Sequence, residues 1–196
     1  MKRLLSTLFV LAVFFTACKE QNPTNNSFEE LSKAQASLIN SYKTADSLWH
    51  EGTVGATLID DFVSEAVTFY EAYPEESISP NMLNNAADFC MTLAASYKKA
   101  TPAVDLSEIA KYAGKAIDLY NLIIKVYPDY EYLNMVYLNR AMIYSDILDD
   151  KESADLEFRE FLHKFPSDPA CEFVSGYLKS DLIGKSSDEI YESFSK

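Results

Sequence analysis

Histidine and glycine are scarce in this sequence, and their scarcity excludes several kinds of catalytic and ligand site. The 196 residues include 2 histidines and 5 glycines. His50 and His163 lie far apart, each near an expected helix end, and neither belongs to an H-E-x-x-H pattern. The sequence contains no glycine-rich phosphate loop and no G-x-S-x-G nucleophile motif. We therefore expect no enzymatic activity, no cofactor and no metal site.

Positive charge is scarce as well. The chain has 17 lysines and arginines against 30 aspartates and glutamates, which gives a formal net charge of −13. Such a surface repels the phosphates of nucleic acids and of anionic lipids. Some carboxylates are adjacent in sequence, as in Asp60-Asp61 and Asp149-Asp150, but neighbouring residues of a helix point about 100° apart. We expect neither a nucleic-acid partner nor a calcium loop.

The first residues have the pattern of a secretory signal. Lys2 and Arg3 precede a mainly apolar stretch from Leu4 to Phe15, which is too short to cross a bilayer as a helix. The stretch ends Phe15-Thr16-Ala17-Cys18 and is followed by polar residues. This ending resembles the lipobox of bacterial lipoproteins, with Phe15 where leucine is usual. The resemblance implies cleavage between Ala17 and Cys18, a diacylglycerol thioether on Cys18, and acylation of the new amine.

Two other interpretations of this segment remain open: cleavage by the ordinary secretory peptidase, and a hairpin that is not cleaved. The ordinary peptidase requires small residues at positions −3 and −1, and Phe15 is large. We therefore expect a signal peptide over residues 1–17, a polar lipidated tether over 18–26 and a helical repeat domain over 27–196. Two or three acyl chains would attach such a protein firmly to a membrane, and loss of Lys2 and Arg3 lowers the formal charge from −13 to −15.

Apolar residues at three- and four-residue spacing predict helices along the rest of the chain. Start signals support them: capping-box patterns begin at Ser27, Asp105 and Ser186, and Pro80 and Pro169 suit the first position of a helix. The predicted fold class is all-α. The expected helices span residues 28–50, 56–73, 80–99, 106–127, 131–148, 152–165, 169–181 and 187–195.

Three of these helices end in an aromatic residue and a proline: Tyr73-Pro74, Tyr127-Pro128 and Phe165-Pro166. Two of the three also share a small residue twelve positions and an aromatic residue eight positions before the proline, namely Ala116 with Tyr120 and Ala154 with Phe158. A small residue lets a neighbouring helix approach closely, and proline ends the helix. The matched positions favour a solenoid of helical hairpins over a plain antiparallel bundle.

Residues 137–166 resemble a tetratricopeptide repeat. Ala141 and Tyr144 match its first helix, and Ala154, Phe158 and Pro166 match its second, although the first helix slips by about one residue against the standard register. The prolines are 38 and 54 residues apart, longer than the usual spacing of about 34. Irregular repeats in a lipoprotein resemble the BamD-like outer-membrane assembly lipoproteins and related cell-envelope proteins. Over about residues 55–180 the resemblance implies a solenoid of seven to eight helices.

The resemblance also implies that the protein binds other envelope proteins or peptides while its lipid holds it to a membrane. Lysine at position 19, directly after the cysteine, is compatible with sorting to the outer membrane. We expect Tyr137, Asn139 and Arg140 to line a partner-binding groove. Cys90 and Cys171 are expected to be buried thiols rather than a disulfide. Two alternatives are a lipid-anchored protein that binds a small ligand or glycan for nutrient uptake, which needs a deep pocket, and a lipid-anchored hydrolase, for which the sequence supplies no clustered catalytic residues.

Overall fold

The computed structural model describes residues 28–50, 55–100 and 105–179, and every regular element in these ranges is a helix. The elements agree with the predicted helices to within one or two residues except between residues 131 and 148. The signal, Cys18, the tether, the capping patterns at Ser27 and Ser186 and the helix predicted over 187–195 lie outside the described residues. The elements are α1 Phe28–His50, α2 Ala56–Ala72, α3 Ser79–Lys99, α4 Leu106–Val126, α5 Leu133–Met142, the π-helix η1 Ile143–Ile147, α6 Lys151–Lys164 and α7 Ala170–Lys179.

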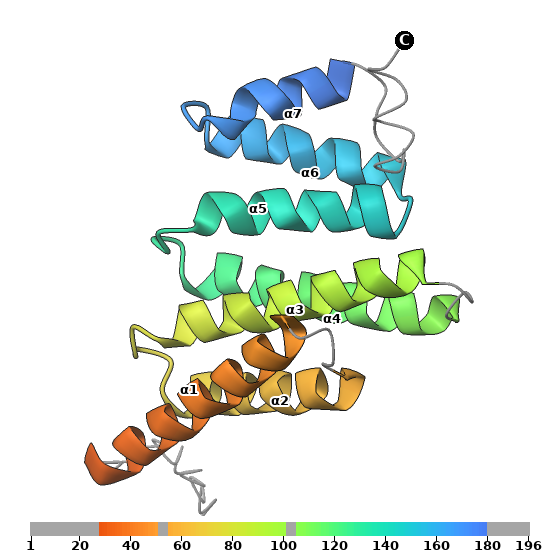
Figure 1. The fold of residues 1–196 in the computed structure, drawn as a ribbon. Helices are drawn as coiled ribbons and strands as arrows, with labels where there is room; N and C mark the ends of the chain where they lie inside the picture. The colour runs from red at the N-terminus through yellow and green to blue at the C-terminus, as the bar shows by residue number, and fades with distance from the viewer. Residues whose placement is uncertain (1–27, 51–54, 101–104, 180–196) are drawn as a thin grey trace, which may run out of the picture.

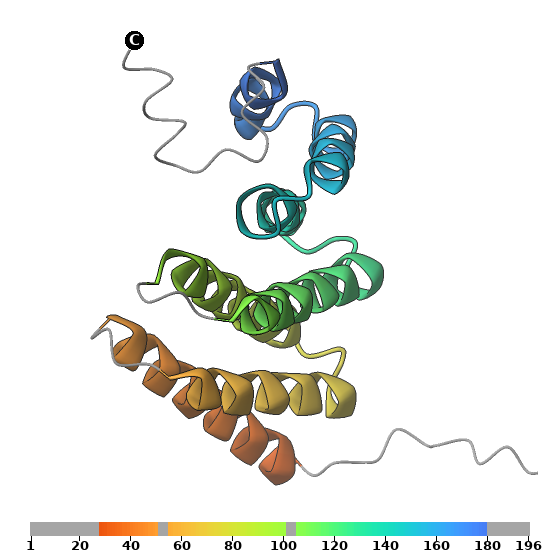
Figure 2. The same ribbon diagram turned by 90° about the vertical axis from the view of Figure 1, so that its right-hand side faces the viewer.

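The helices form an elongated stack in which consecutive helices are roughly antiparallel (Figure 1). The connections that follow α2, α4 and α6 all lie along one edge of the stack, on the left in Figure 1. Seen from the side, α6 is displaced from α5 and α7, so these helices alternate between two layers (Figure 2). The described residues therefore show an all-α, repeat-like arrangement of helix pairs, as predicted. Among these helices, none combines the length and the apolarity that crossing a membrane requires.

The three aromatic-proline endings have one geometry. In each, the backbone N–H of the aromatic residue donates to the carbonyl four residues earlier: Tyr73 to Phe69 at 2.8 Å, Tyr127 to Ile123 at 2.8 Å and Phe165 to Phe161 at 2.9 Å. The proline that follows has no N–H with which to continue the helix. Side-chain caps begin the neighbouring helices: Asp105 Oδ1 accepts from the Ser107 N–H at 2.8 Å, and Asp168 Oδ1 accepts from the Ala170 N–H at 2.8 Å.

The matched small and aromatic residues form the core. Ala116, Tyr120, Ala154 and Phe158 are each 0% exposed. One apolar cluster spans α1 to α4 and extends to η1, and a second lies between α5, α6 and α7. Truncating a fully buried aromatic residue such as Phe158 to alanine typically costs about 3–5 kcal/mol. The repeated positions are therefore sites of close helix packing.

The single helix predicted over residues 131–148 is wrong in its last turns. From Ile143 the backbone changes to a π-helix, and the Leu148 N–H donates to the Ile143 carbonyl at 3.0 Å. A π-turn holds one more residue than an α-turn. This extra residue lies between Ala141 and Ala154, which is where the tetratricopeptide pattern slips by one residue. Asp149, with φ of 55°, ends the element in the left-handed conformation.

The two cysteines that the structure describes are both free thiols, as expected. Cys90 is fully buried, and burial raises the pKa of its thiol to about 12. Cys171 departs from the expectation of full burial because it is only half-buried near the start of α7. Its Sγ donates to the Phe165 carbonyl at 3.0 Å. Both residues act as small packing groups.

Candidate functional site

A surface cavity of about 320 Å³ opens between α3 and the continuous α5–η1 segment. Its lining comes from one stripe on each element and consists of Met91, Thr92, Ala95, Asn139, Met142, Asp146 and Ile147. We call this surface, together with the Asp88 cluster described next, the α3–α5 groove. The lining is mostly apolar, and the two methionines are flexible and polarizable, which lets them adapt to different side chains.

A polar cluster lies beside the cavity and is centred on Asp88 of α3. One oxygen of this carboxylate accepts from the hydroxyl of Tyr120 on α4 and from Nδ2 of Asn139 on α5, the latter at 3.2 Å. The other oxygen accepts from Nδ2 of Asn84 at 3.0 Å. Asn139 also lines the cavity, so the polar cluster and the apolar cavity share this side chain. Three helices converge on this one carboxylate.

Asp88 is held by neutral donors. Among the described residues, no lysine, arginine or histidine forms an ion pair with it. Burial raises the pKa of Asp88 above its usual range, although the hydrogen bonds from Tyr120, Asn139 and Asn84 oppose the shift. Burial likewise raises the pKa of Tyr120, and the charge of Asp88 adds to that effect. Within the part of the chain that the structure describes, this half-buried carboxylate therefore has no counter-ion.

The π-helix forms the far end of the groove and is tied to both of its neighbours. Lys98 of α3 donates to the Asp146 carbonyl at 2.9 Å and to Asp149 Oδ1 at 2.7 Å. Tyr177 of α7 donates to Asp146 Oδ1 at 3.2 Å, and its hydroxyl lies 2.6 Å from Ser145 Oγ. Burial raises the pKa of Tyr177 to about 12, so this phenol is a hydrogen-bonding group at neutral pH. These contacts place Asp146 at the rim of the cavity.

Two of the three residues predicted to line a groove are buried instead. Tyr137 is 2% exposed and packs edge-on against Phe165, with ring centroids 5.4 Å apart. Arg140 is 8% exposed and is held by Glu157 and Asn121. The prediction was wrong for both because these side chains point into the contacts of α5 with α4 and α6, where neighbouring groups neutralise and cover them. Of the three predicted residues, Asn139 is the one that lines this cavity.

The Arg140 cluster is a second buried polar site, formed by charges of opposite sign. The guanidinium donates from Nε to Glu157 Oε2 at 2.8 Å and from Nη1 to Asn121 Oδ1 at 2.6 Å. Glu160 lies 3.3 Å from Nη2 and completes the cluster. Burial raises the pKa of Glu157, although the positive charge of Arg140 opposes the shift. The cluster joins α4, α5 and α6, and its charged groups are satisfied internally.

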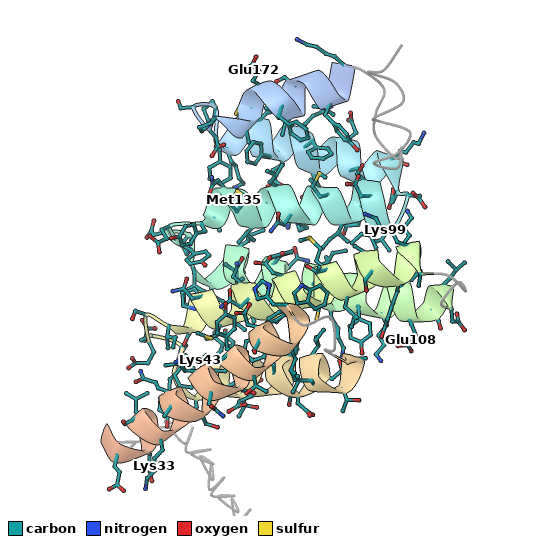
Figure 3. The ribbon with its side chains drawn as sticks, in the orientation of Figure 1. Lys33, Lys43, Lys99, Glu108, Met135 and Glu172 are labelled. Atoms are coloured by element: carbon teal, nitrogen blue, oxygen red, sulfur yellow. The ribbon has the colours of Figure 1, made fainter. Side chains whose placement is uncertain are left out.

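The turn edge carries two further surface cavities, of about 430 and 460 Å³, on either side of residues 128–131. Tyr127 and Tyr130 line the first, but both hydroxyls are used internally, on the Pro74 carbonyl at 2.7 Å and on Asn81 Oδ1 at 2.9 Å. Tyr132 is 50% exposed and Met135 43% exposed. Figure 3 shows Met135 at this edge of the stack and Lys99 at the opposite end of α3.

No motif in the sequence marks Asp88, Met91 or Met142 as site residues. One signal was available, because Asp88 is the single acidic residue of α3 and lies in the middle of that helix. Among the described residues, no group of three or more histidine, cysteine, aspartate or glutamate side chains is arranged to hold an ion. No protein-family model, curated protein or solved structure matches the chain.

Proposed function

We propose that this protein is a lipid-anchored scaffold of the cell envelope that binds segments of other proteins in the α3–α5 groove. The observation that carries the proposal is the cavity of about 320 Å³ between the first helices of two successive helix pairs. It is open, mainly apolar and lined by two methionines, as in surfaces that accept partner side chains. Helical solenoids commonly bind partners on surfaces that several repeats build together.

Site-specific photo-crosslinking in living cells tests the groove. A photoreactive phenylalanine analogue at Thr92, which lines the cavity, is compared with the same analogue at Glu152, which is exposed on α6. We expect a discrete cross-linked protein from position 92 and none from position 152. Cross-linking that is equal at the two positions, or absent from both, would contradict binding in the groove.

The anchor is tested separately. We propose that acyl chains on Cys18 hold the scaffold to the membrane, because Phe15-Thr16-Ala17-Cys18 resembles a lipobox. Replacement of Cys18 by serine should move the protein from the membrane fraction to the soluble fraction and abolish labelling by an alkyne analogue of palmitate. A labelled, membrane-bound Cys18→Ser protein would contradict lipid attachment at this residue. Service in outer-membrane protein assembly is the narrower form of the proposal, and the identity of the cross-linked protein tests it.

A second candidate function is capture of a small ligand or glycan. The observation that favours it is the pair of turn-edge cavities of about 430 and 460 Å³, one of them lined by Tyr127 and Tyr130, because pockets for small ligands begin at about 300 Å³. The candidate predicts that a glycan array probed with the purified protein gives signals that disappear in the Tyr130→Ala variant. An array without signal would exclude glycans from this role.

A further inference from the structure

Asp88 has more acceptor positions than the described residues have donors facing it. A carboxylate can accept about four hydrogen bonds, and Asp88 accepts three, of which two fall on one oxygen and one on the other. Beside it, Asn84 Oδ1 is buried and has no donor among the described residues. The described residues therefore supply three protein donors to Asp88. A partner group that contacts this carboxylate directly must donate, because an ionised carboxylate only accepts.

No positive charge among the described residues pairs with the negative charge of Asp88. Asp88 is half-buried and forms no ion pair among the described residues, whereas the partly buried carboxylates Asp60 and Glu157 each contact a lysine or arginine, at 2.6 Å from Lys115 and at 2.8 Å from Arg140. Tyrosines lie around Asp88. Burial raises the pKa of Tyr42 and of Tyr130, and the negative charge of Asp88 adds to both shifts, at Tyr42 after that of Asp46.

The cavity defines what must lie next to that cation. Asn139 donates to Asp88 at 3.2 Å and also lines the cavity, so Asp88 and the cavity have this side chain as a common neighbour. Met91, Ala95, Met142 and Ile147 supply its apolar surface, which suits an aliphatic side chain. Asp146 also lines the cavity, and at this end the positive charge of Lys98 is paired with Asp149 at 2.7 Å.

We propose that the α3–α5 groove selects a protein segment in which a lysine or arginine adjoins an aliphatic side chain. The cation lies against Asp88 and donates to its open acceptor position, and the aliphatic group enters the cavity between Met91 and Met142. This inference rests on the proposed function, and it names the chemistry of the partner. The acidic surface of the whole chain, with a formal charge of −13, attracts such a segment from a distance.

The test uses a displayed library of random twelve-residue peptides, selected against the full chain in detergent. Asp88→Asn removes the charge and keeps the size of the side chain. Asp61→Asn removes one charge from an exposed position of α2 and is the matched control. We expect the wild-type protein and the Asp61→Asn protein to enrich peptides with a basic residue next to Leu, Ile, Met or Val. The Asp88→Asn protein should lose the preference for the basic residue.

A binding cycle with one selected peptide measures the contact. Replacing its basic residue by glutamine should weaken binding to wild type at least tenfold, and Asp88→Asn should weaken binding of the unchanged peptide by a similar factor. The two changes together should cost little more than either alone. Thermal unfolding of each variant, recorded in parallel, shows that the fold is retained.

The outcomes separate the inference from the proposed function. Enriched peptides without a basic preference, or a preference that Asp88→Asn leaves intact, would overturn the cation inference and leave peptide binding in place. Failure to enrich any peptide would overturn both. Spermidine could also displace the selected peptide at a concentration close to that of the peptide. If peptide binding were in addition unaffected by replacement of its aliphatic residue, the site would be one for small cations, and the inference would be overturned.

Discussion

Asp88 and Glu157 are partly buried carboxylates in successive helix pairs of one stack, and they are held in opposite ways. Glu157 faces Arg140, whose guanidinium donates to it at 2.8 Å. Asp88 faces a phenol and two amides and no cation among the described residues. Burial raises the pKa of both groups. The difference is that the chain neutralises the charge of Glu157 internally, whereas no cation among the described residues neutralises that of Asp88.

The largest effect is expected at the internally neutralised site. Arg140→Met leaves Glu157, whose side chain is 18% exposed, without its cation. Removal of one member of a buried ion pair typically costs about 3–5 kcal/mol, so the urea midpoint of unfolding should fall strongly. Arg159→Met is the control, because that arginine pairs with Asp155 on the surface and its loss should change little. A small change in Arg140→Met would show that Glu157 takes up a proton at little cost.

A smaller loss is expected when Asp88 loses a neutral donor. Tyr120→Phe removes the hydroxyl that donates to Asp88 and should cost about 1–3 kcal/mol in urea unfolding, since the carboxylate then lacks one of three donors. Tyr112→Phe is the matched control on the same helix. Its hydroxyl donates to Asp60 at 3.1 Å, but Asp60 keeps Lys115 at 2.6 Å, so the loss should be smaller. Equal losses would contradict the distinction between the two carboxylates.

Asp88→Asn should act in the opposite direction. The amide keeps an oxygen for Tyr120 and Asn139, removes a half-buried charge, and supplies an N–H that a rotated Asn84 amide can accept through its buried Oδ1. We expect a gain of about 1 kcal/mol, which in a chain of this size corresponds to a rise in Tm of about 2–4 °C. A destabilised variant would mean that the charge itself holds the three helices together.

The smallest expected effect is a change with pH in the Tm difference between the wild type and Asp88→Asn. Because burial raises the folded-state pKa of Asp88, the folded wild type binds this proton more tightly than the unfolded chain does. The stability that the protonated Asp88 side chain contributes is complete below the pKa of the unfolded chain, about 3.9, and is lost as pH rises through the pKa of the folded state. The advantage of Asp88→Asn in Tm should therefore grow between pH 4 and pH 7. Glu157 is present in both proteins, so its own titration cancels in the difference.

Much of the helical structure could be predicted from local pattern. Pro74, Pro128 and Pro166 predict where α2, α4 and α6 end, and the structure confirms each ending. The sequence predicts a capping box at Asp105, and Asp105 does cap α4, but its carboxylate accepts from the N–H of Ser107 rather than from that of Glu108. The sequence did not predict the π-turn, because Ile143–Ile147 contains no proline or glycine to mark it. The one-residue slip in the repeat pattern coincides with this turn.

The candidate site was predicted less well. Enrichment of tyrosine at interfaces predicts Tyr137 in a groove, and the position of Arg140 on the first helix of the last repeat predicts the same for that residue, yet both are buried in the structure. Whether a helical arginine faces solvent or a neighbour depends on what lies opposite, and Glu157 comes from the next helix. Asp88 and Met142 lie on different helices, and only packing shows that one groove contains them.

The sequence by itself determined the properties that depend on near neighbours along the chain. These are the all-helical fold class, the proline-terminated helices, the excess of negative charge, and the pattern at Cys18 on which the proposed anchor rests. The tertiary structure decided which charges are neutralised. The reason is physical: the hydrogen bonds and caps of a helix join residues within about four positions of each other, whereas the state of a half-buried carboxylate depends on groups that packing brings from distant helices.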